Sequence, residues 1–282
     1  MIVLRDLRKS FGPVVAVSGL SLRVEPGEVF GLLGPNGAGK TTTLSMLVGL
    51  ITPDAGTAEI EGLGSCSRPR VRASLGVAPQ ALALYDQLSA RENLHFFGRL
   101  YGLTGTLLRQ RVETVLGLVG LSDRGGDRAG TYSGGMKRRL NLAAALVHDP
   151  PVLLLDEPTA GVDPQSRASI IDLVRALRAE GRTIIYTTHY MEEAQKVCDR
   201  VGIIDKGALL DVGRVDELIA RHGGSSVVAV KRGDVEELIE THDPTRTVAD
   251  VLRASPDVES IRIERPDLET VFLSMTGRRL RD

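Results

Sequence analysis

The sequence contains no tryptophan, and only five tyrosines and five phenylalanines stand among its 282 residues. The core must therefore be filled mainly by leucine, valine, isoleucine and alanine. Cysteine is equally scarce, since Cys66 and Cys198 are the only two, and they lie far apart without the spacing of metal ligands. We expect two reduced thiols that act as small apolar residues.

Long hydrophobic runs are also missing. No apolar stretch approaches the roughly 20 residues that cross a bilayer as a helix, and residues 1–6 become charged too soon for a signal peptide. We therefore expect a cytosolic chain. An excess of one charge is absent too, because 35 lysines and arginines face 36 acidic residues. The composition thus gives no support to non-specific binding of nucleic acid.

The length allows one large domain and a small appendage. Apolar or β-branched runs indicate strands, and 3.6-residue periodicity indicates helices. Strands broken by turns are expected before residue 30. The later expected strands are 29–33, 57–61, 75–78, 152–155, 183–187 and 201–204. The expected helices are 40–50, one that begins after Ser89 with Glu92 in its first turn, 107–118, 135–146 and 164–178. Continuous apolar strands joined by helices favour a buried parallel sheet.

Residues 81–147 differ in texture, because amphipathic helices replace strands there. A second change comes at the Gly- and Ser-rich linker 222–226. We therefore predict a main domain over 1–220, with a helical subdomain at about 81–147, and a small α/β appendage over 221–282. In the appendage we expect strands at 227–230 and 261–263, and helices at 235–240 and 268–275.

The segment 34–41 fits the pattern G-x-x-x-x-G-K-[ST] of a phosphate-binding loop. Its residues are Gly34, Pro35, Asn36, Gly37, Ala38, Gly39, Lys40 and Thr41. The glycines allow consecutive backbone N–H groups to point into one concavity, and the helix N-terminus that follows favours anions. We expect Lys40 to reach the β- and γ-phosphates and the Thr41 hydroxyl to coordinate Mg²⁺. A strand before the loop and a helix after it are the expected context.

Asp156 and Glu157 follow the apolar run 152–155. A carboxylate at the end of a buried strand can hold Mg²⁺ rigidly opposite a phosphate loop, and this is the role expected of Asp156. Glu157, one residue later, is placed to act as general base on the attacking water. An Asp-Glu pair by itself is common on protein surfaces, so this interpretation depends on the phosphate loop.

A second glycine-rich turn, Ser133-Gly134-Gly135, opens a predicted helix about twenty residues before Asp156. Alone it would be an ordinary helix cap. A serine hydroxyl and bare glycine N–H groups at a helix N-terminus also form an anion site. With this turn added in the right order, residues 1–220 resemble the ATP-binding cassette (ABC) family, the ATPase subunits of ABC transporters. The resemblance implies that Ser133, Gly134 and Gly135 contact the γ-phosphate of ATP bound to an opposing subunit.

The resemblance also implies a fold and further site residues. The implied fold is α/β: a P-loop NTPase core of mainly parallel sheet, an antiparallel β subdomain, a helical subdomain and the α/β appendage. Other positions match the family's motifs one by one. They are Phe11 for adenine stacking, Thr42 at the phosphates, Gln80 for Mg²⁺ and water, Asp163 in the loop 160–163 at the dimer interface, and His189 as the switch histidine at the γ-phosphate.

The glycine-rich turn departs from the common L-S-G-G-Q form, because Tyr132 and Met136 stand at its two ends. The form 133–139 and the ending 268–278 resemble ATPase subunits of bacterial ABC-2-type exporters, including drug-resistance ones. We therefore expect an ATP-hydrolysing subunit of such an exporter. The alternatives are an importer ATPase and a non-transport ABC ATPase that acts as an ATP-switched binding module. A DNA-repair ATPase would need a long coiled-coil insertion, and a translation factor would usually have a second cassette. The sequence shows neither feature.

The same resemblance implies the partners and the place of work. ATP and Mg²⁺ are the expected cofactors, with no other metal. The chain is expected to form a head-to-tail homodimer, or to pair with a paralogous ABC subunit, around two ATP molecules. A separate transmembrane permease is the other expected partner, and nucleic acid is not expected. This predicts a cytoplasmic protein that is peripheral on the inner face of the cell membrane. The transported compound stays open.

Overall fold

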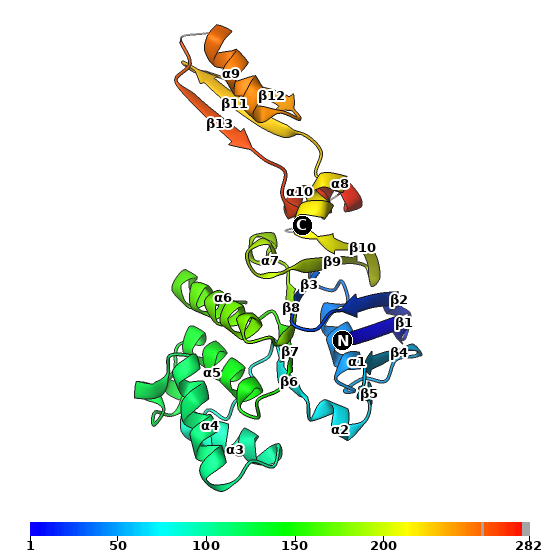
Figure 1. The fold of residues 1–282 in the computed structure, drawn as a ribbon, viewed down its shortest axis with the longest axis vertical. Helices are drawn as coiled ribbons and strands as arrows, with labels where there is room; N and C mark the ends of the chain where they lie inside the picture. Colours follow the sequence, from blue (N-terminus) through cyan, green and yellow to red (C-terminus); the bar gives the residue numbers. More distant parts are fainter. Residues whose placement is uncertain (255–256, 278–282) are drawn as a thin grey trace. The chain divides into compact units, whose positions relative to one another are not determined.

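The computed structural model describes residues 1–254 and 257–277 (Figure 1). They fall into two compact units, Met1–Val212 and the residues from Gly213 onward, each of which is described by itself. The boundary predicted after residue 220 lies within the helix Val215–His222, which belongs to the second unit. Among the described residues, no helix combines the length and the hydrophobicity needed to cross a membrane.

A six-stranded sheet in the order β10-β9-β3-β8-β7-β6 forms the centre of the first unit (Figure 1). Its strands are β3 (Val29–Leu33), β6 (Leu75–Ala78), β7 (Val152–Asp156), β8 (Thr183–Thr188), β9 (Arg200–Asp205) and β10 (Ala208–Arg214). The pairs β9-β3, β3-β8, β8-β7 and β7-β6 are all parallel. Every residue of β3, β7 and β8 is buried. The predicted parallel sheet is therefore confirmed, because continuous apolar strands need cover on both faces.

Two hydrophobic cores lie on opposite faces of this sheet. Alternate side chains of a strand point to opposite faces, so Leu153 and Leu155 join one core whereas Leu154 joins the other. The first core contains residues of α5 (Gly134–Leu146) and α6 (Pro164–Ala179). The second contains residues of α1 (Lys40–Leu47) and of α2 (Pro69–Arg72). α7 (Met191–Val197) packs near β3 and β8.

An antiparallel sheet in the order β2-β1-β4-β5 covers the second core. Its strands are β1 (Ile2–Phe11), β2 (Val14–Val24), β4 (Ala55–Ile60) and β5 (Gly64–Ser65). Ile2, Leu7 and Leu20 are fully buried on its inner side. The expected antiparallel subdomain is thus confirmed, and the helix α1 lies between the two sheets of this unit.

The helical segment also follows the prediction. It comprises α3 (Ala90–Leu100), α4 (Gly105–Leu118), the short 3₁₀ turns η1 (Ser122–Arg124) and η2 (Ala129–Thr131), and α5. Ser89 caps α3: its hydroxyl accepts a hydrogen bond from Glu92 N, and the Glu92 carboxylate accepts one from Ser89 N. This reciprocal pair is the capping box that the sequence indicated. Close packing joins α3 to α4, because a Cβ at Gly98 would lie 2.4 Å from Leu108.

The second unit has a three-stranded antiparallel sheet in the order β12-β11-β13. Its elements are α8 (Val215–His222), β11 (Ser226–Arg232), β12 (Val235–Thr241), α9 (Pro244–Ala254), β13 (Ser260–Glu264) and α10 (Leu268–Thr276). Val251 of α9 packs on Val228 and Val230 of β11 to form a small core. The segment 268–278, whose sequence resembles the ending of ABC-2-type ATPase subunits, lies within the described residues except for residue 278.

One element of this unit was predicted wrongly. The segment 235–240 is the strand β12, not a helix. It pairs with β11 from Arg232 opposite Val235 onward, so Gly233 and Asp234 form a two-residue hairpin turn in which Gly233 has φ +56°. A Gly-Asp pair between two strand-forming runs is a hairpin signal. The helix α9 was missed, although its apolar residues recur at helical spacing.

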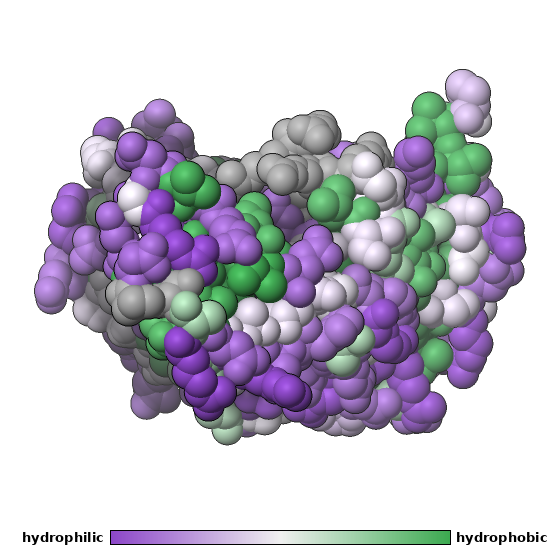
Figure 2. All heavy atoms as spheres, turned by 90° about the horizontal axis from the view of Figure 1, so that it is seen from above, coloured by the Kyte–Doolittle hydropathy of each residue, from purple (hydrophilic) through white to green (hydrophobic). Residues whose placement is uncertain are grey.

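Exposed hydrophobic side chains are present, and some lie together: the rings of Tyr85 and Phe96 are both exposed, and their centroids are 4.9 Å apart. On the face drawn in Figure 2, hydrophilic residues predominate and hydrophobic residues form smaller groups between them. Leu107 on α4 is 54% exposed, whereas its neighbour Leu108 is 3% exposed. Exposed apolar residues are normal on folded proteins, so these alone identify no binding surface.

This adjacent pair of leucines gives a stability prediction. Leu108→Ala should lower the free energy of unfolding by about 2–5 kcal/mol, because it leaves a cavity between α3 and α4. Leu107→Ala on the same helix is the matched control and should change stability by less than about 1 kcal/mol. Urea unfolding followed by circular dichroism measures both. Equal losses for the two variants would contradict the packing described here.

Candidate functional site

The loop between β3 and α1 has the geometry of a phosphate cradle. Gly37 and Gly39 adopt φ angles of +80° and +104°, where side chains other than glycine are strained. A Cβ at Gly34 would lie 2.1 Å from the carbonyl oxygen of Ile204, and one at Gly39 would lie 2.4 Å from that of Ala16. The glycines are therefore required by close backbone packing as well as by conformation. The strand before and the helix after the loop agree with the predicted context.

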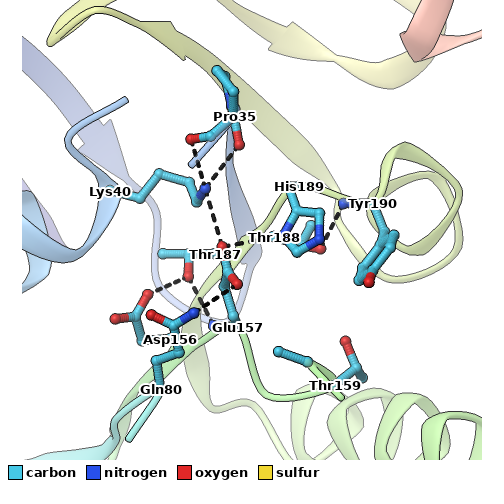
Figure 3. Close-up of polar contacts among 12 residues, drawn as sticks. Pro35, Lys40, Gln80, Asp156, Glu157, Thr159, Thr187, Thr188, His189 and Tyr190 are labelled. Atoms are coloured by element: carbon cyan, nitrogen blue, oxygen red, sulfur yellow. Dashed lines mark hydrogen bonds and ion pairs between the residues drawn. The ribbon is translucent and has the colours of Figure 1, made fainter. Parts of the chain in front are cut away.

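Lys40 is the first residue of α1 and is only 5% exposed. Its ammonium group donates to the carbonyl oxygens of Gly34 (2.7 Å) and Pro35 (3.1 Å), both in the same loop. Its third neighbour is Oε1 of Glu157, at 3.1 Å. These contacts hold the ammonium inside the curve of the loop (Figure 3), where phosphate oxygens would meet it.

Asp156 lies at the carboxyl end of β7, within reach of the loop. Its Oδ2 accepts a hydrogen bond from the Thr41 hydroxyl (2.8 Å), and its Oδ1 accepts one from the Thr187 hydroxyl at the end of β8 (2.6 Å). Parallel pairing of β7 with β8 brings Asp156 directly opposite Thr187. A hydroxyl and a carboxylate thus stand side by side as hard oxygen donors, the kind that Mg²⁺ prefers.

Glu157 is the point at which the other predicted side chains converge. It is 5% exposed and has a left-handed φ of +46°, a conformation that is costly for glutamate and often found at functional sites. Its N–H donates to the Thr187 hydroxyl (2.9 Å). Its Oε2 accepts from the Gln80 amide (3.0 Å), and its Oε1 lies 3.2 Å from Nδ1 of His189. Figure 3 shows these groups around one carboxylate.

A cavity of about 480 Å³ opens beside this carboxylate. Its lining combines the phosphate loop, Gln80 and Glu157 with residues that no motif indicated. The full lining is Val14, Val15, Ala16, Asn36, Gly37, Gly39, Lys40, Thr41, Thr42, Gln80, Glu157 and Lys206. Its volume lies within the usual range of small-molecule sites. Val14–Ala16 come from β2 and Lys206 from the turn between β9 and β10, so only the fold brings them to the cavity.

Phe11, the predicted adenine partner, is not part of this lining. It lies at the end of β1, is 49% exposed, and pairs with the lining residue Val14 across the hairpin. The Lys9 ammonium lies 5.6 Å from the centre of its ring. Phe11 is therefore at the rim, next to the cavity but not in its wall.

Ser133, Gly134 and Gly135 do not line this cavity either. Ser133 caps α5, and its hydroxyl accepts from Met136 N (3.3 Å). Ser133 and Gly134 are exposed, whereas Gly135 is buried against α6. A Cβ at Gly135 would lie 2.1 Å from the Ser166 hydroxyl. The last glycine of the turn thus has a packing role within the chain.

Asp163 caps α6 in a similar way. Its carboxylate accepts from Ser166 N at 2.9 Å, and hydrogen bonds with Ser166 hold the pKa of Asp163 below its ordinary value. Like the serine turn, Asp163 is exposed and lies outside the cavity lining. Apart from Phe11 at the rim, the predicted site residues therefore fall into two groups, one around Glu157 and one at the starts of α5 and α6.

Arg138 is a buried site residue that sequence reasoning missed. It lies on α5 and donates to the carbonyl oxygens of Gln80 (2.7 Å) and Ala160 (3.2 Å). Burial lowers the pKa of this guanidinium from its ordinary value, which Glu157 and Asp156 partly offset. Arg138 thus ties the helix that begins with the serine turn to the segments of Gln80 and Ala160. Arg138 follows Gly135 by three residues on α5. This closeness to the serine turn was the sequence feature that could have indicated a role at the site.

The phosphate loop gives a direct prediction. Gly39→Ala should weaken ATP binding more than about tenfold, because the added Cβ meets the Ala16 carbonyl and the φ angle suits only glycine. Gly117→Ala is the matched control, since a Cβ there meets no atom closer than 3.8 Å in the helix α4. Equilibrium binding of a fluorescent ATP analogue compares the two variants. Unchanged binding by Gly39→Ala would contradict the cradle.

Comparisons with known proteins agree with this geometry. The family model described as "ABC transporter" matches residues 17–160. The linearmycin resistance ATP-binding protein LnrL of Bacillus subtilis is 39% identical, with 100% of both chains covered. The Nod factor export ATP-binding protein I of Cupriavidus metallidurans is 42% identical over 99% of this chain and 98% of its own.

Solved structures give the same result. The structure of an ATP-binding subunit of an ABC transporter superimposes with a TM-score of 0.71 and 27% identity, covering 79% of this chain and 93% of its own. The phosphate loop, the carboxylates at the end of β7 and the serine turn at the start of α5 therefore stand in a fold that this ABC subunit shares. The chain belongs to the ABC transporter family, as one of its ATP-binding and ATP-hydrolysing subunits.

Proposed function

We propose that this chain is the ATP-hydrolysing motor of an exporter of the ABC-2 type and drives a separate membrane permease. The names of two relatives that span almost the whole chain support export, since one is a resistance protein and the other a Nod factor export protein. The chain would then work on the cytoplasmic face of the cell membrane, bound to the permease. The substituted serine turn and the family resemblance of the C-terminal region favour an exporter over an importer.

The observation that carries the catalytic part is the meeting of Lys40, Gln80 and His189 at the Glu157 carboxylate. ATP phosphates would lie along the loop 34–41, bound by backbone N–H groups, Lys40, Thr41 and Thr42. Lys40 would then exchange its contact with Glu157 for phosphate oxygens. This exchange frees Glu157 to orient a water molecule and accept its proton. His189 contacts the same oxygen of Glu157, Oε1, as Lys40 does, and there it would meet the γ-phosphate.

Mg²⁺ fits the donors at this site. The Thr41 hydroxyl and the Asp156 carboxylate already lie side by side, and the Gln80 side chain supplies an amide oxygen. The described residues include no cluster of three or more His, Cys, Asp or Glu side chains suited to a metal. Because Mg²⁺ is usually bound by one or two carboxylates together with substrate phosphates, these few donors match it. When bound, the ion would neutralise charge on the phosphates.

We infer that the exposed group, Ser133, Gly134 and Asp163, completes the site of a second subunit. These residues lie outside the cavity that contains Lys40 and Glu157, and the N-terminus of a helix such as α5 favours anions. A two-fold pair can bring each turn to the partner's phosphate loop, because a two-fold interface is self-complementary. The partner would be a second copy of this chain or a paralogous ABC subunit. ATP would then join the subunits, and its hydrolysis would release them.

Replacement of the base tests the catalytic proposal. Glu157→Gln should lower the turnover number about 10²- to 10⁴-fold, the usual contribution of a general base, while ATP binding is kept. Phosphate release and nucleotide binding are measured on the same purified full-length protein. Glu113→Gln, on the exposed side of α4, serves as the control and should turn over ATP normally. Unimpaired hydrolysis by Glu157→Gln would exclude Glu157 as the base.

The dimer proposal has its own test. Glu157→Gln protein should form an ATP-dependent dimer on size exclusion with light scattering. Adding Gly134→Asp should abolish this dimer, because a carboxylate would face the partner's phosphates. ATP binding to the monomer should persist. The monomer accommodates a side chain at this position, since a Cβ at Gly134 approaches no atom closer than 4.0 Å. A dimer that survives the substitution would rule out the head-to-tail arrangement.

A further inference from the structure

The most strongly connected buried carboxylate outside the nucleotide cavity belongs to Glu193. It lies on α7, is 2% exposed, and corresponds to none of the motifs used above. Its Oε2 accepts hydrogen bonds from three hydroxyl groups, those of Thr159 (2.7 Å), Tyr186 (2.9 Å) and Thr188 (3.2 Å). Burying a carboxylate this deeply costs free energy unless it is paired and hydrogen-bonded. The groups that surround Glu193 therefore indicate what it does.

The charge of Glu193 is balanced from α6. Nε of Arg167 lies 3.3 Å from Oε1 of Glu193, and the same guanidinium lies 4.6 Å from the centre of the Tyr190 ring. Burial, and then the Glu193 carboxylate itself, raise the pKa of Tyr186 well above its ordinary value. Tyr186 therefore stays protonated and remains a donor. Three hydroxyl groups thus donate to Oε2 of Glu193, and one guanidinium lies beside its Oε1.

Two of these donors lie within two positions of the proposed catalytic residues in the sequence. Thr188 directly precedes His189, and Thr159 follows Glu157 by two positions. The Thr188 hydroxyl also accepts from Tyr190 N at 2.9 Å. This one hydroxyl therefore bridges the residues on both sides of His189 and points its proton at Glu193. Figure 3 shows Thr188, His189 and Tyr190 in this turn, with Thr159 on the neighbouring segment.

The segment that contains Thr159 is held on two sides. Glu193 binds the Thr159 hydroxyl, and Arg138 binds the carbonyl of the next residue, Ala160. Asp163, at the exposed start of α6, follows three residues later. Any shift of this segment would therefore change the contact with Glu193 and move the loop that leads to Asp163.

We propose that Glu193 is a positioning residue for ATP hydrolysis: it fixes His189 against Glu157 and links both to the segment 159–163. It is not part of the lining of the nucleotide cavity and acts through the Thr188 and Thr159 hydroxyls. The proposal rests on the catalytic roles proposed above for Glu157 and His189. A misplacement of about 1 Å can slow a reaction about 100-fold, so the 3.2 Å contact between His189 and Glu157 is what Glu193 protects.

The test uses the isosteric substitution Glu193→Gln in the full-length protein. It removes the charge and turns two amide hydrogens toward hydroxyl donors or Arg167. We expect the turnover number to fall about 10- to 100-fold, with the KM for ATP within about twofold of the original. Glu192→Gln is the matched control. This neighbouring side chain is 85% exposed, and its ion pair with Lys196 is long, at 3.9 Å. The control should keep the original turnover.

A double-mutant cycle separates positioning from general damage. If Glu193 acts through His189, adding Glu193→Gln to His189→Ala should slow hydrolysis by much less than it slows the unsubstituted protein. Thr188→Val, which removes only the bridging hydroxyl, should reproduce part of the loss. Unchanged melting temperature and ATP binding establish that each variant is folded.

Either of two results would overturn the proposal: normal turnover by Glu193→Gln, or fully additive losses in the cycle. Failure of the underlying catalytic assignment looks different. In that case Glu157→Gln or His189→Ala would itself leave hydrolysis unchanged, whatever the behaviour of Glu193→Gln.

Discussion

The buried contact between Lys40 and Glu157 is the interaction on which the site depends. Both side chains are almost completely buried and their charged atoms lie 3.1 Å apart. A buried ion pair contributes little net stability, because desolvation offsets the attraction. Its role is instead to hold the Lys40 ammonium and the Glu157 carboxylate in place beside the phosphate loop. The loop carbonyls hold Lys40, while Gln80 and His189 hold Glu157, so each charge has further partners.

The parallel sheet makes this meeting possible. β3, β6, β7 and β8 run in the same direction, so their carboxyl ends lie along one edge. The phosphate loop follows β3, Gln80 follows β6, Asp156 ends β7, and His189 follows β8. Ligand sites of open α/β sheets form at this edge for that reason. Two side chains from helices hold the loops at this edge. Glu193 of α7 accepts hydrogen bonds from Thr159 and Thr188, and Arg138 of α5 donates to the carbonyl oxygens of Gln80 and Ala160.

Local pattern was sufficient for much of this. The phosphate loop, the strand before Asp156 and the cap at Ser89 each depend on residues within a few positions of one another, and the structure has them where they were expected. The segment 235–240 failed because six residues without a clear period can be either helix or strand. Its pairing with β11 decided the matter. Arg138 and Glu193 could not be singled out, since the segments of Gln80 and Thr159 that they hold lie 58 and 34 positions away in the sequence. Lys206 lines the cavity only because the fold brings the turn between β9 and β10 to it.

The sequence by itself therefore determined the chemistry: a phosphate loop, two carboxylates after a buried strand, and a serine turn in the order of the ABC family. These signals are local, because a tight turn or a helix cap needs particular residues at fixed spacing. The tertiary structure decided how the chemistry is held. The 3.1 Å approach of Lys40 to Glu157 and the hydrogen bond from Thr159 to Glu193 join segments distant in sequence, and only packing on a common sheet fixes such distances.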